Sequence, residues 1–208
     1  MPTQVELCNL ALAKCSGKPI TTIADTTPRA EICAQEYQAC LDEVLEAAFW
    51  NFAITRAVLV AATAPTFGYT YAWTLPDDFV AVEIFNDSYV KDYNSEALFK
   101  IEGGEILTDA SVANLVYVRN GTLSPDTVDS FGALMTPMFV NLFTTLLGSK
   151  IAPTIKNDGP GYATSLLQRY QLELTAARTK NANARKRRTI GERTSSAVLS
   201  SRRQSTNG

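Results

Sequence analysis

Histidine is absent from the 208 residues of this chain. That absence removes the usual general base at neutral pH, the Ser–His and Cys–His nucleophile pairs and the commonest metal ligand. A phosphate-binding glycine loop is missing too, because Gly103-Gly104 lacks the Lys-Ser/Thr continuation and does not open a helix. We therefore predict that the chain is not an enzyme and that it holds no catalytic residue, cofactor or metal.

Paired carboxylates offer the one enzymatic alternative. Three pairs stand at predicted turns or at a helix start: Asp77/Asp78, Glu102/Glu105 and Asp126/Asp129. Acids are favoured at such places for local hydrogen bonds and for the helix dipole, so structural roles are expected. A hydrolase acting on cell wall would need two acids at catalytic separation, a distance that the sequence does not give.

Cysteine is scarce and long hydrophobic runs are missing. Cys8 and Cys15, like Cys33 and Cys40, are spaced to share one helix face. Without Cys-x-x-Cys or histidine they make a poor zinc site, and we predict core packing, with a disulfide or a metal as the alternatives. The longest apolar region, 138–147, is far shorter than the roughly 20 residues of a membrane span. We expect a soluble chain without a secretion signal.

Helical patterns occupy the N-terminal part of the chain. Thr3 followed by Glu6 forms a capping box, which predicts a first helix running to Cys15. Thr27-Pro28 repeats the start signal, and apolar residues at helical spacing predict a second helix reaching Ala48. The link between them is short, so we expect an antiparallel pair whose cysteines share one seam.

Helical spacing returns in the C-terminal part. A helix is predicted after Ser124-Pro125, and Pro137 either kinks it or starts a new one reaching about Ile151. Residues 157–161 form a break. A last amphipathic helix begins near Ala163 and loses its apolar face inside a basic segment.

The middle of the chain changes to a period of two, which predicts strands. The expected strands are 50–58, 70–75, 79–85, 98–102, 105–108 and 114–119. Pro76-Asp77-Asp78 marks one turn, and Gly103-Gly104 is the signal of a tight hairpin. We predict an antiparallel sheet, with 86–97 as a polar loop.

This order of elements predicts an α+β fold, in which an antiparallel helical bundle carries an inserted antiparallel β-sheet and a flexible basic C-terminal tail. The expected divisions are a bundle of residues 1–49 and 122–180, a β-rich insertion of residues 50–121, and an extended tail of residues 181–208.

Charges of opposite sign are separated along the chain. Residues 176–208 hold nine of the nineteen basic residues and one of the twenty-one acids. Their net charge is therefore about +8, whereas that of residues 1–175 is about −10. A segment with so few apolar residues cannot bury itself in a core, and it must meet a partner or stay solvated.

Two aromatic blocks carry a more specific signal. They read Trp-Asn-Phe-Ala-x-x-Arg-Ala at 50–57 and Tyr-x-Tyr-Ala-x-x-Leu-Pro-x-Asp at 69–78, after a Cys-Asn-Leu-Ala-Leu-Ala opening at 8–13. In structural terms they predict a strand pair closing the core, with Trp50, Phe52 and Trp73 buried and Arg56 fixing a polar edge. The blocks resemble the head-to-tail connector, or adaptor, family of short-tailed bacteriophages (podoviruses), the group that includes tail tubular protein A. The motif residues are Trp50, Phe52, Arg56, Tyr71, Trp73 and Pro76.

The resemblance covers roughly residues 4–180. It implies a structural virion protein at the portal vertex, made in the host cytoplasm, that forms a ring of about twelve copies between the portal and the tail nozzle or tube. Such a ring seals the packaged head, and genomic DNA passes through its lumen during ejection without specific binding. The polar loop 86–97 and the long C-terminal tail depart from the family pattern.

The resemblance also implies that the C-terminal segment docks on the portal. The expected docking residues are Arg178, Lys180, Arg185, Lys186, Arg187, Arg188, Ile190, Arg193, Val198 and Leu199. The alternative is a basic-tailed module that binds nucleic acid, since clustered Lys and Arg neutralise phosphates without sequence preference. If acids of the body line the lumen, DNA meets like charge and slides without sticking.

Overall fold

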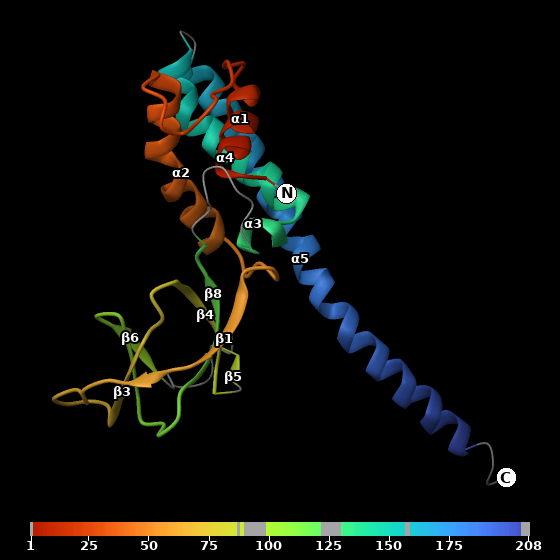
Figure 1. Cartoon of the computed structure of the whole chain (residues 1–208). Helices are drawn as coiled ribbons and strands as arrows, with labels where there is room; N and C mark the ends of the chain where they lie inside the picture. The colour runs from red at the N-terminus through yellow and green to blue at the C-terminus, as the bar shows by residue number, and fades with distance from the viewer. Residues whose placement is uncertain (1, 87, 90–98, 122–129, 157–158, 205–208) are drawn as a thin grey trace.

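The computed structural model describes residues 2–86, 88–89, 99–121, 130–156 and 159–204. These residues form a mixed fold in which helices gather at one end and strands at the other, as the α+β prediction required (Figure 1). The helices are α1 (Gln4–Lys14), α2 (Pro28–Glu46), α3 (Ser130–Leu134), α4 (Pro137–Ile155) and α5 (Gly159–Gln204). The strands are β1 (Ile54–Val58), β2 (Val60–Ala61), β3 (Tyr71–Thr74), β4 (Phe79–Phe85), β5 (Ser88–Tyr89), β6 (Lys100–Glu102), β7 (Glu105–Thr108) and β8 (Asn114–Arg119).

α4 is the central helix of the helical end, and α1, α2 and α5 all pack against it. Its side chains from Leu142 to Ser149 are buried without interruption. By length and composition alone α4 could cross a membrane, but 61% of its 18-residue apolar stretch is buried inside the protein. Its apolar composition is accounted for by the three helices that cover it.

Side-chain caps begin the helices where the sequence predicts. The Thr3 hydroxyl accepts a bond from the Glu6 backbone N–H at 3.2 Å, and the Glu6 carboxylate accepts one from the Thr3 N–H at 2.9 Å. The Thr136 hydroxyl caps α4 by accepting a bond from the Phe139 backbone N–H at 3.3 Å, with Pro137 in the first turn. Pro137 therefore begins a new helix. The expected start at Ser124-Pro125 and the acids Asp126 and Asp129 lie outside the described residues.

The four cysteines are buried in the helical core as free thiols, which confirms the packing prediction. Cys8 of α1 and Cys33 of α2 share a hydrogen bond, which together with burial raises the pKa of the Cys8 thiol. The first two helices therefore meet through one cysteine from each.

The strands form two four-stranded antiparallel sheets, where the sequence predicted one. The orders are β1-β8-β4-β5 and β2-β3-β7-β6. The chain passes from the first sheet to the second at Leu59, a buried residue whose N–H donates to the Ala113 carbonyl at 2.9 Å. The predicted pairing of the two aromatic blocks is wrong as well, because β1 pairs with β8 while β3 pairs with β2 and β7.

The sheet end has its own small core, built from residues of both sheets such as Phe85, Ile106 and Leu115, together with Leu59 between β1 and β2. β4, β7 and β8 have the predicted bounds. Gly103 and Gly104 adopt φ of 57° and 83° and close the predicted hairpin between β6 and β7. Most of the polar loop 86–97 lies outside the described residues.

The basic C-terminal segment differs from its prediction. Residues 181–204, expected to be extended, continue α5 as one helix of 46 residues. Beyond Pro160 the helix contains no proline, and Ala, Arg, Lys and Leu favour helix even where no apolar face remains. α5 is about 69 Å long, and its C-terminal part runs away from both the bundle and the sheets (Figure 1).

Candidate interaction site at the root of the terminal helix

The segment linking α2 to β1 forms the junction between the helical end and the sheets. Trp50 is 2% exposed, and its indole Nε1–H donates to the Val44 carbonyl at 2.7 Å. Its ring meets Phe139 of α4 edge-on, with centroids 5.1 Å apart. Phe52 packs on the same Phe139 ring at 4.8 Å. Trp50 and Phe52 of the first aromatic block therefore fix the sheets to the start of α4.

The same junction holds α5. The Arg178 Nε–H donates to the carbonyl of Ala47, the C-cap of α2, at 2.8 Å. The Asn181 side chain donates to the Phe49 carbonyl at 2.6 Å and accepts from the Asn51 backbone N–H at 3.3 Å. The guanidinium stands at the negative end of the α2 dipole, where a cation is favoured. These contacts clamp α5 to the junction.

A cavity of about 360 Å³ lies beside this clamp. Its lining is Trp50, Asn51, Phe52, Thr136, Pro137, Met138, Ala177, Lys180 and Asn181. The wall is mainly apolar and Lys180 supplies a cation, so the cavity suits an apolar side chain next to a carboxylate.

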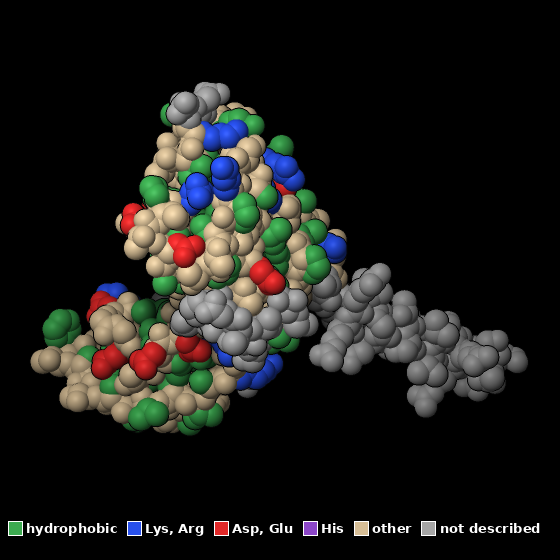
Figure 2. Space-filling model, turned by 45° about the horizontal axis from the view of Figure 1, so that its top comes forward, with side chains coloured by type: hydrophobic (Ala, Val, Ile, Leu, Met, Phe, Trp, Pro, Cys, Tyr) green, Lys and Arg blue, Asp and Glu red, His purple; other side chains and the backbone are tan. Residues whose placement is uncertain are grey.

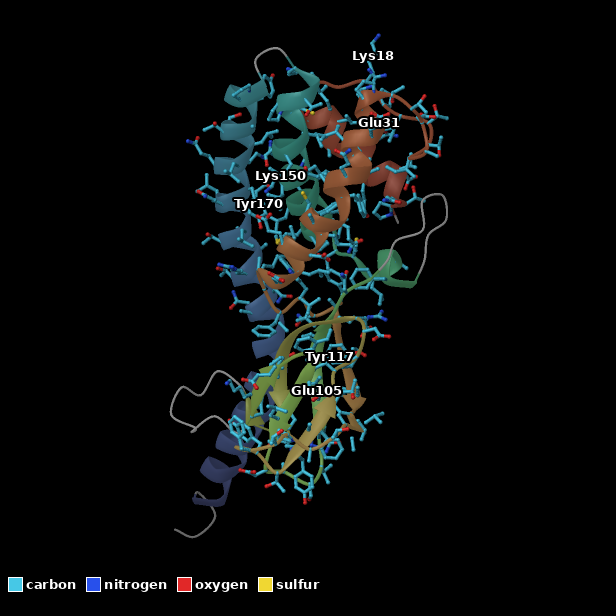
Figure 3. All side chains as sticks on the ribbon, turned by 90° about the vertical axis from the view of Figure 1, so that its left-hand side faces the viewer. Lys18, Glu31, Glu105, Tyr117, Lys150 and Tyr170 are labelled. Carbon is cyan, nitrogen blue, oxygen red and sulfur yellow. The ribbon has the colours of Figure 1, made fainter. Side chains whose placement is uncertain are left out.

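α5 divides into two halves at this point. Leu166, Tyr170 and Ala177 are buried against the bundle, and Figure 3 shows Tyr170 on the α5 side of the helical end. Ala182 and Asn183 are exposed. The remaining helical residues up to Gln204 project about 35 Å beyond the clamp. We call residues 182–204 the projecting half.

The expected portal-docking residues fall on both halves. Arg178 and Lys180 lie at the root, where Arg178 has an internal partner. The side chains of the others lie outside the described part of the chain, and their backbone belongs to the projecting half: Arg185, Lys186, Arg187, Arg188, Ile190, Arg193, Val198 and Leu199.

The motif residues separate into two groups. Trp50 and Phe52 belong to the helical core or pack against it, whereas Trp73 packs against the core of the sheets, with Tyr71 beside it at 6.4 Å between ring centroids. Trp50 is fully buried as predicted, while Phe52 and Trp73 are half-buried. Arg56 is exposed on β1, an edge strand, and Pro76 is half-buried next to β3.

A polar network that no sequence pattern predicted ties α1, α4 and α5 together. The Lys14 ammonium donates to the Asn141 carbonyl at 2.7 Å, the Asn141 Oδ1 at 2.9 Å and the Thr145 hydroxyl at 2.6 Å. Thr145 donates to Glu173 at 2.9 Å, and Glu173 accepts from the Arg169 Nε–H at 2.7 Å. Burial lowers the pKa of Lys14 to about 8, although the Glu173 carboxylate opposes this.

An apolar groove of about 890 Å³ runs between α1 and the start of α4. Leu10, 46% exposed, stands in it, and Lys14 forms part of its wall. The Lys14 ammonium already donates three hydrogen bonds, to Asn141 and Thr145, so its nitrogen is occupied and is a poor candidate for a nucleophile.

Acids of the two carboxylate pairs that lie in the described residues make local contacts. Asp78 accepts from the Tyr117 hydroxyl at 2.8 Å, and its carbonyl accepts from the Asn120 N–H at 2.6 Å. Glu102 faces Glu105 across the β6–β7 hairpin and pairs with Lys100. Within the described residues no three His, Cys, Asp or Glu side chains stand close enough to hold a metal.

No protein-family model matches the chain, and no curated protein matches it in sequence.

Proposed function

We propose that this protein is a structural head-to-tail adaptor of a phage virion, whose projecting half of α5 docks on the portal. One observation carries the proposal: α5 is clamped at Arg178 and Asn181, and then leaves the body as a basic helix. Because α5 is held at its root and continues beyond the body, its outer part reaches a partner surface that the body itself does not contact. Such a device suits a permanent assembly.

Charge separation supports the same role. The projecting half and the root carry most of the excess positive charge, while acids exceed bases two to one in residues 1–175. On the face seen in Figure 2, basic side chains gather over the far end of the bundle, while acidic side chains lie over both the sheets and the bundle and some basic ones lie at the sheet end. A basic helix fits an acidic groove on a portal, and an acidic body repels DNA that passes beside it.

The adaptor role requires no catalysis, only fixed contacts between the parts of the protein. Trp50 and Phe52 join the sheets to the bundle, and the Lys14 network fixes α1 and α5 on α4. In this proposal the ring lies between the portal and the nozzle or tail tube and closes the packaged head, and DNA crosses its lumen during ejection.

The second candidate is a module that binds nucleic acid through the projecting half. Arg185, Lys186, Arg187 and Arg188 are consecutive, which favours contact with phosphates. Four such contacts predict that the logarithm of the DNA-binding constant falls with the logarithm of salt at a slope of about −3.6.

Truncation after Asn183 tests the proposal, because it removes most of the projecting half and keeps the Arg178 and Asn181 contacts. The full chain should comigrate with a portal ring from its own virus, and the truncated chain should not, while both unfold at the same temperature. A matched variant changes residues 185–188 to Gln and keeps the helix. Portal attachment by the truncated chain would rule out the docking role. Salt-sensitive binding to short duplex DNA without a portal complex would favour the second candidate.

A further inference from the structure

The cavity beside the α5 clamp has an apolar wall that comes from three separate segments. Trp50 and Phe52 belong to the link between α2 and β1. Pro137 and Met138 belong to the first turn of α4, and Ala177 belongs to α5. At about 360 Å³ the cavity lies at the small end of the range of ligand sites, about 300 to 1,000 Å³. It therefore accepts one large side chain rather than a whole helix.

Internal contacts hold this wall in place. The rings of Trp50 and Phe52 pack on Phe139, with centroids 5.1 and 4.8 Å from it. The Asn181 side chain donates to the Phe49 carbonyl at 2.6 Å, which fixes α5 beside these rings. A wall that is already fixed loses little freedom when a ligand enters, so the binding of even one side chain is favoured.

Lys180 gives the cavity its charge. Its side chain is exposed, and it belongs to none of the ion pairs formed among the described residues. No acidic residue is among the described residues that line the cavity, and the first turn of α4 contains none. The dipole of α4 adds partial positive charge at this end of the helix. A carboxylate that enters beside Lys180 is therefore favoured by the lysine and by the helix.

The position of the cavity connects it with the projecting half of α5. Lys180 and Asn181 line the cavity, and Ala182 is the first residue of the projecting half. On the proposed function, the projecting half contacts a partner along its length. The surface of that partner therefore begins next to the cavity, and the two contacts form one continuous interface.

We propose that the cavity receives an anchor from the partner that binds the projecting half: one large apolar side chain, aromatic or leucine, next to a carboxylate. The apolar part fills the space between Phe52, Met138 and Ala177, and the carboxylate pairs with Lys180. This anchor rests on the proposed adaptor function, in which the partner is the portal. It adds a second contact at the root of the docking helix, and each contact raises the effective concentration of the other.

A small molecule with the same two groups tests the cavity without a portal. 3-Phenylpropionate carries a phenyl ring close to a carboxylate, and 3-phenylpropanamide is its uncharged counterpart. The chain has two tryptophans, Trp50 in the cavity wall and Trp73 in the sheets, so their indole N–H NMR signals report on both places. Trp73→Phe assigns the two signals. Millimolar 3-phenylpropionate should shift the Trp50 signal and leave that of Trp73 in place.

Preference for the carboxylate is the second readout. The amide should bind about threefold more weakly than the carboxylate, and Lys180→Gln should remove this difference. Thr179→Glu changes the net charge by the same amount at an exposed position outside the lining, so it is the matched control and should keep the difference. Equal binding of amide and carboxylate by the wild type, or no shift of the Trp50 signal, would overturn the anchor.

Portal attachment separates the anchor from the proposed function. Lys180→Gln in the full chain should weaken attachment to a portal ring about threefold, and Thr179→Glu should weaken it less. Attachment that requires the projecting half but is unchanged by Lys180→Gln would rule out the anchor and leave the proposed function standing. Self-association that Lys180→Gln abolishes, with portal attachment unchanged, would instead assign the cavity to a second copy of this chain.

Discussion

The guanidinium of Arg178 donates a 2.8 Å hydrogen bond to the carbonyl oxygen of Ala47. These residues lie 131 positions apart, and the bond joins α5 to the C-terminus of α2. Arg178, although it belongs to the basic C-terminal segment of the sequence, is therefore bound to the body of the protein. Under the proposed docking role, the part of that segment that is left to contact a portal begins beyond Arg178.

Arg178→Gln should lower the free energy of unfolding by about 1 kcal/mol, because it removes a cation and a hydrogen bond from the end of α2. Arg178→Lys keeps the charge without the planar guanidinium, so its free energy of unfolding should lie between those of the wild type and of Arg178→Gln. Urea unfolding followed by circular dichroism measures both. Equal stability of all three chains would show that the bond contributes nothing.

Asn181→Ala should loosen the root of α5. The change removes the bonds to the Phe49 carbonyl and from the Asn51 N–H, which together contribute about 1 to 2 kcal/mol. Hydrogen exchange should become faster in residues 177–183 while the central turns of α4 stay protected. Asn183→Ala is the matched control, since Asn183 is exposed two residues beyond the clamp. The same exchange pattern in both variants would contradict the clamp.

Trp50 should be the most sensitive residue of the junction. Trp50→Phe keeps most of the ring but leaves the buried Val44 carbonyl without its indole donor, at a cost of about 1 to 3 kcal/mol. Trp50→Ala also opens a cavity against Phe139 and should cost about 3 to 5 kcal/mol. Thermal unfolding of both variants checks the order. A Trp50→Phe chain as unstable as Trp50→Ala would assign the whole loss to the missing indole donor and would contradict the cavity contribution.

Local patterns in the sequence predicted most of the elements. The Thr3 and Glu6 pair marked the start of α1, and short runs rich in apolar β-branched and aromatic residues gave β4 and β8 their bounds. Alternation cannot tell which sheet a strand joins, so the passage from one sheet to the other at Leu59 was missed. Loss of the apolar face after Ala177 suggested the end of a helix, but helix propensity continues without it.

The contacts of the site were harder to predict, because they join distant residues. Trp50 was expected to be buried, yet its partners Val44 and Phe139 come from two different helices. Asn181 meets Asn51 across 130 positions. Lys14 is the basic residue in the last turn of α1, where the helix dipole alone accounts for it. Its role in the polar network needs the arrangement of three helices.

Lys14 should make stability depend on pH in the alkaline range. Burial lowers its pKa from 10.5 to about 8 in the folded chain. Between these values the unfolded chain holds a proton that the folded chain has lost, so stability rises with pH across the window. Lys14→Met lacks this contribution. The unfolding free energy of the wild type minus that of Lys14→Met should therefore increase from pH 8 to pH 10.5.

The difference between the two chains isolates Lys14 from other groups that titrate in the same range. Burial raises the pKa of the Cys40 thiol to about 12, which makes stability fall as pH rises above 9 in both chains alike. Glu173→Gln provides an independent check, because the Glu173 carboxylate favours the charged form of Lys14. Its loss should lower the Lys14 pKa further, as measured by NMR of the lysine Hε–Cε signals. A Lys14 pKa unchanged by Glu173→Gln, together with a flat stability difference, would show that the network does not couple α1 to α5.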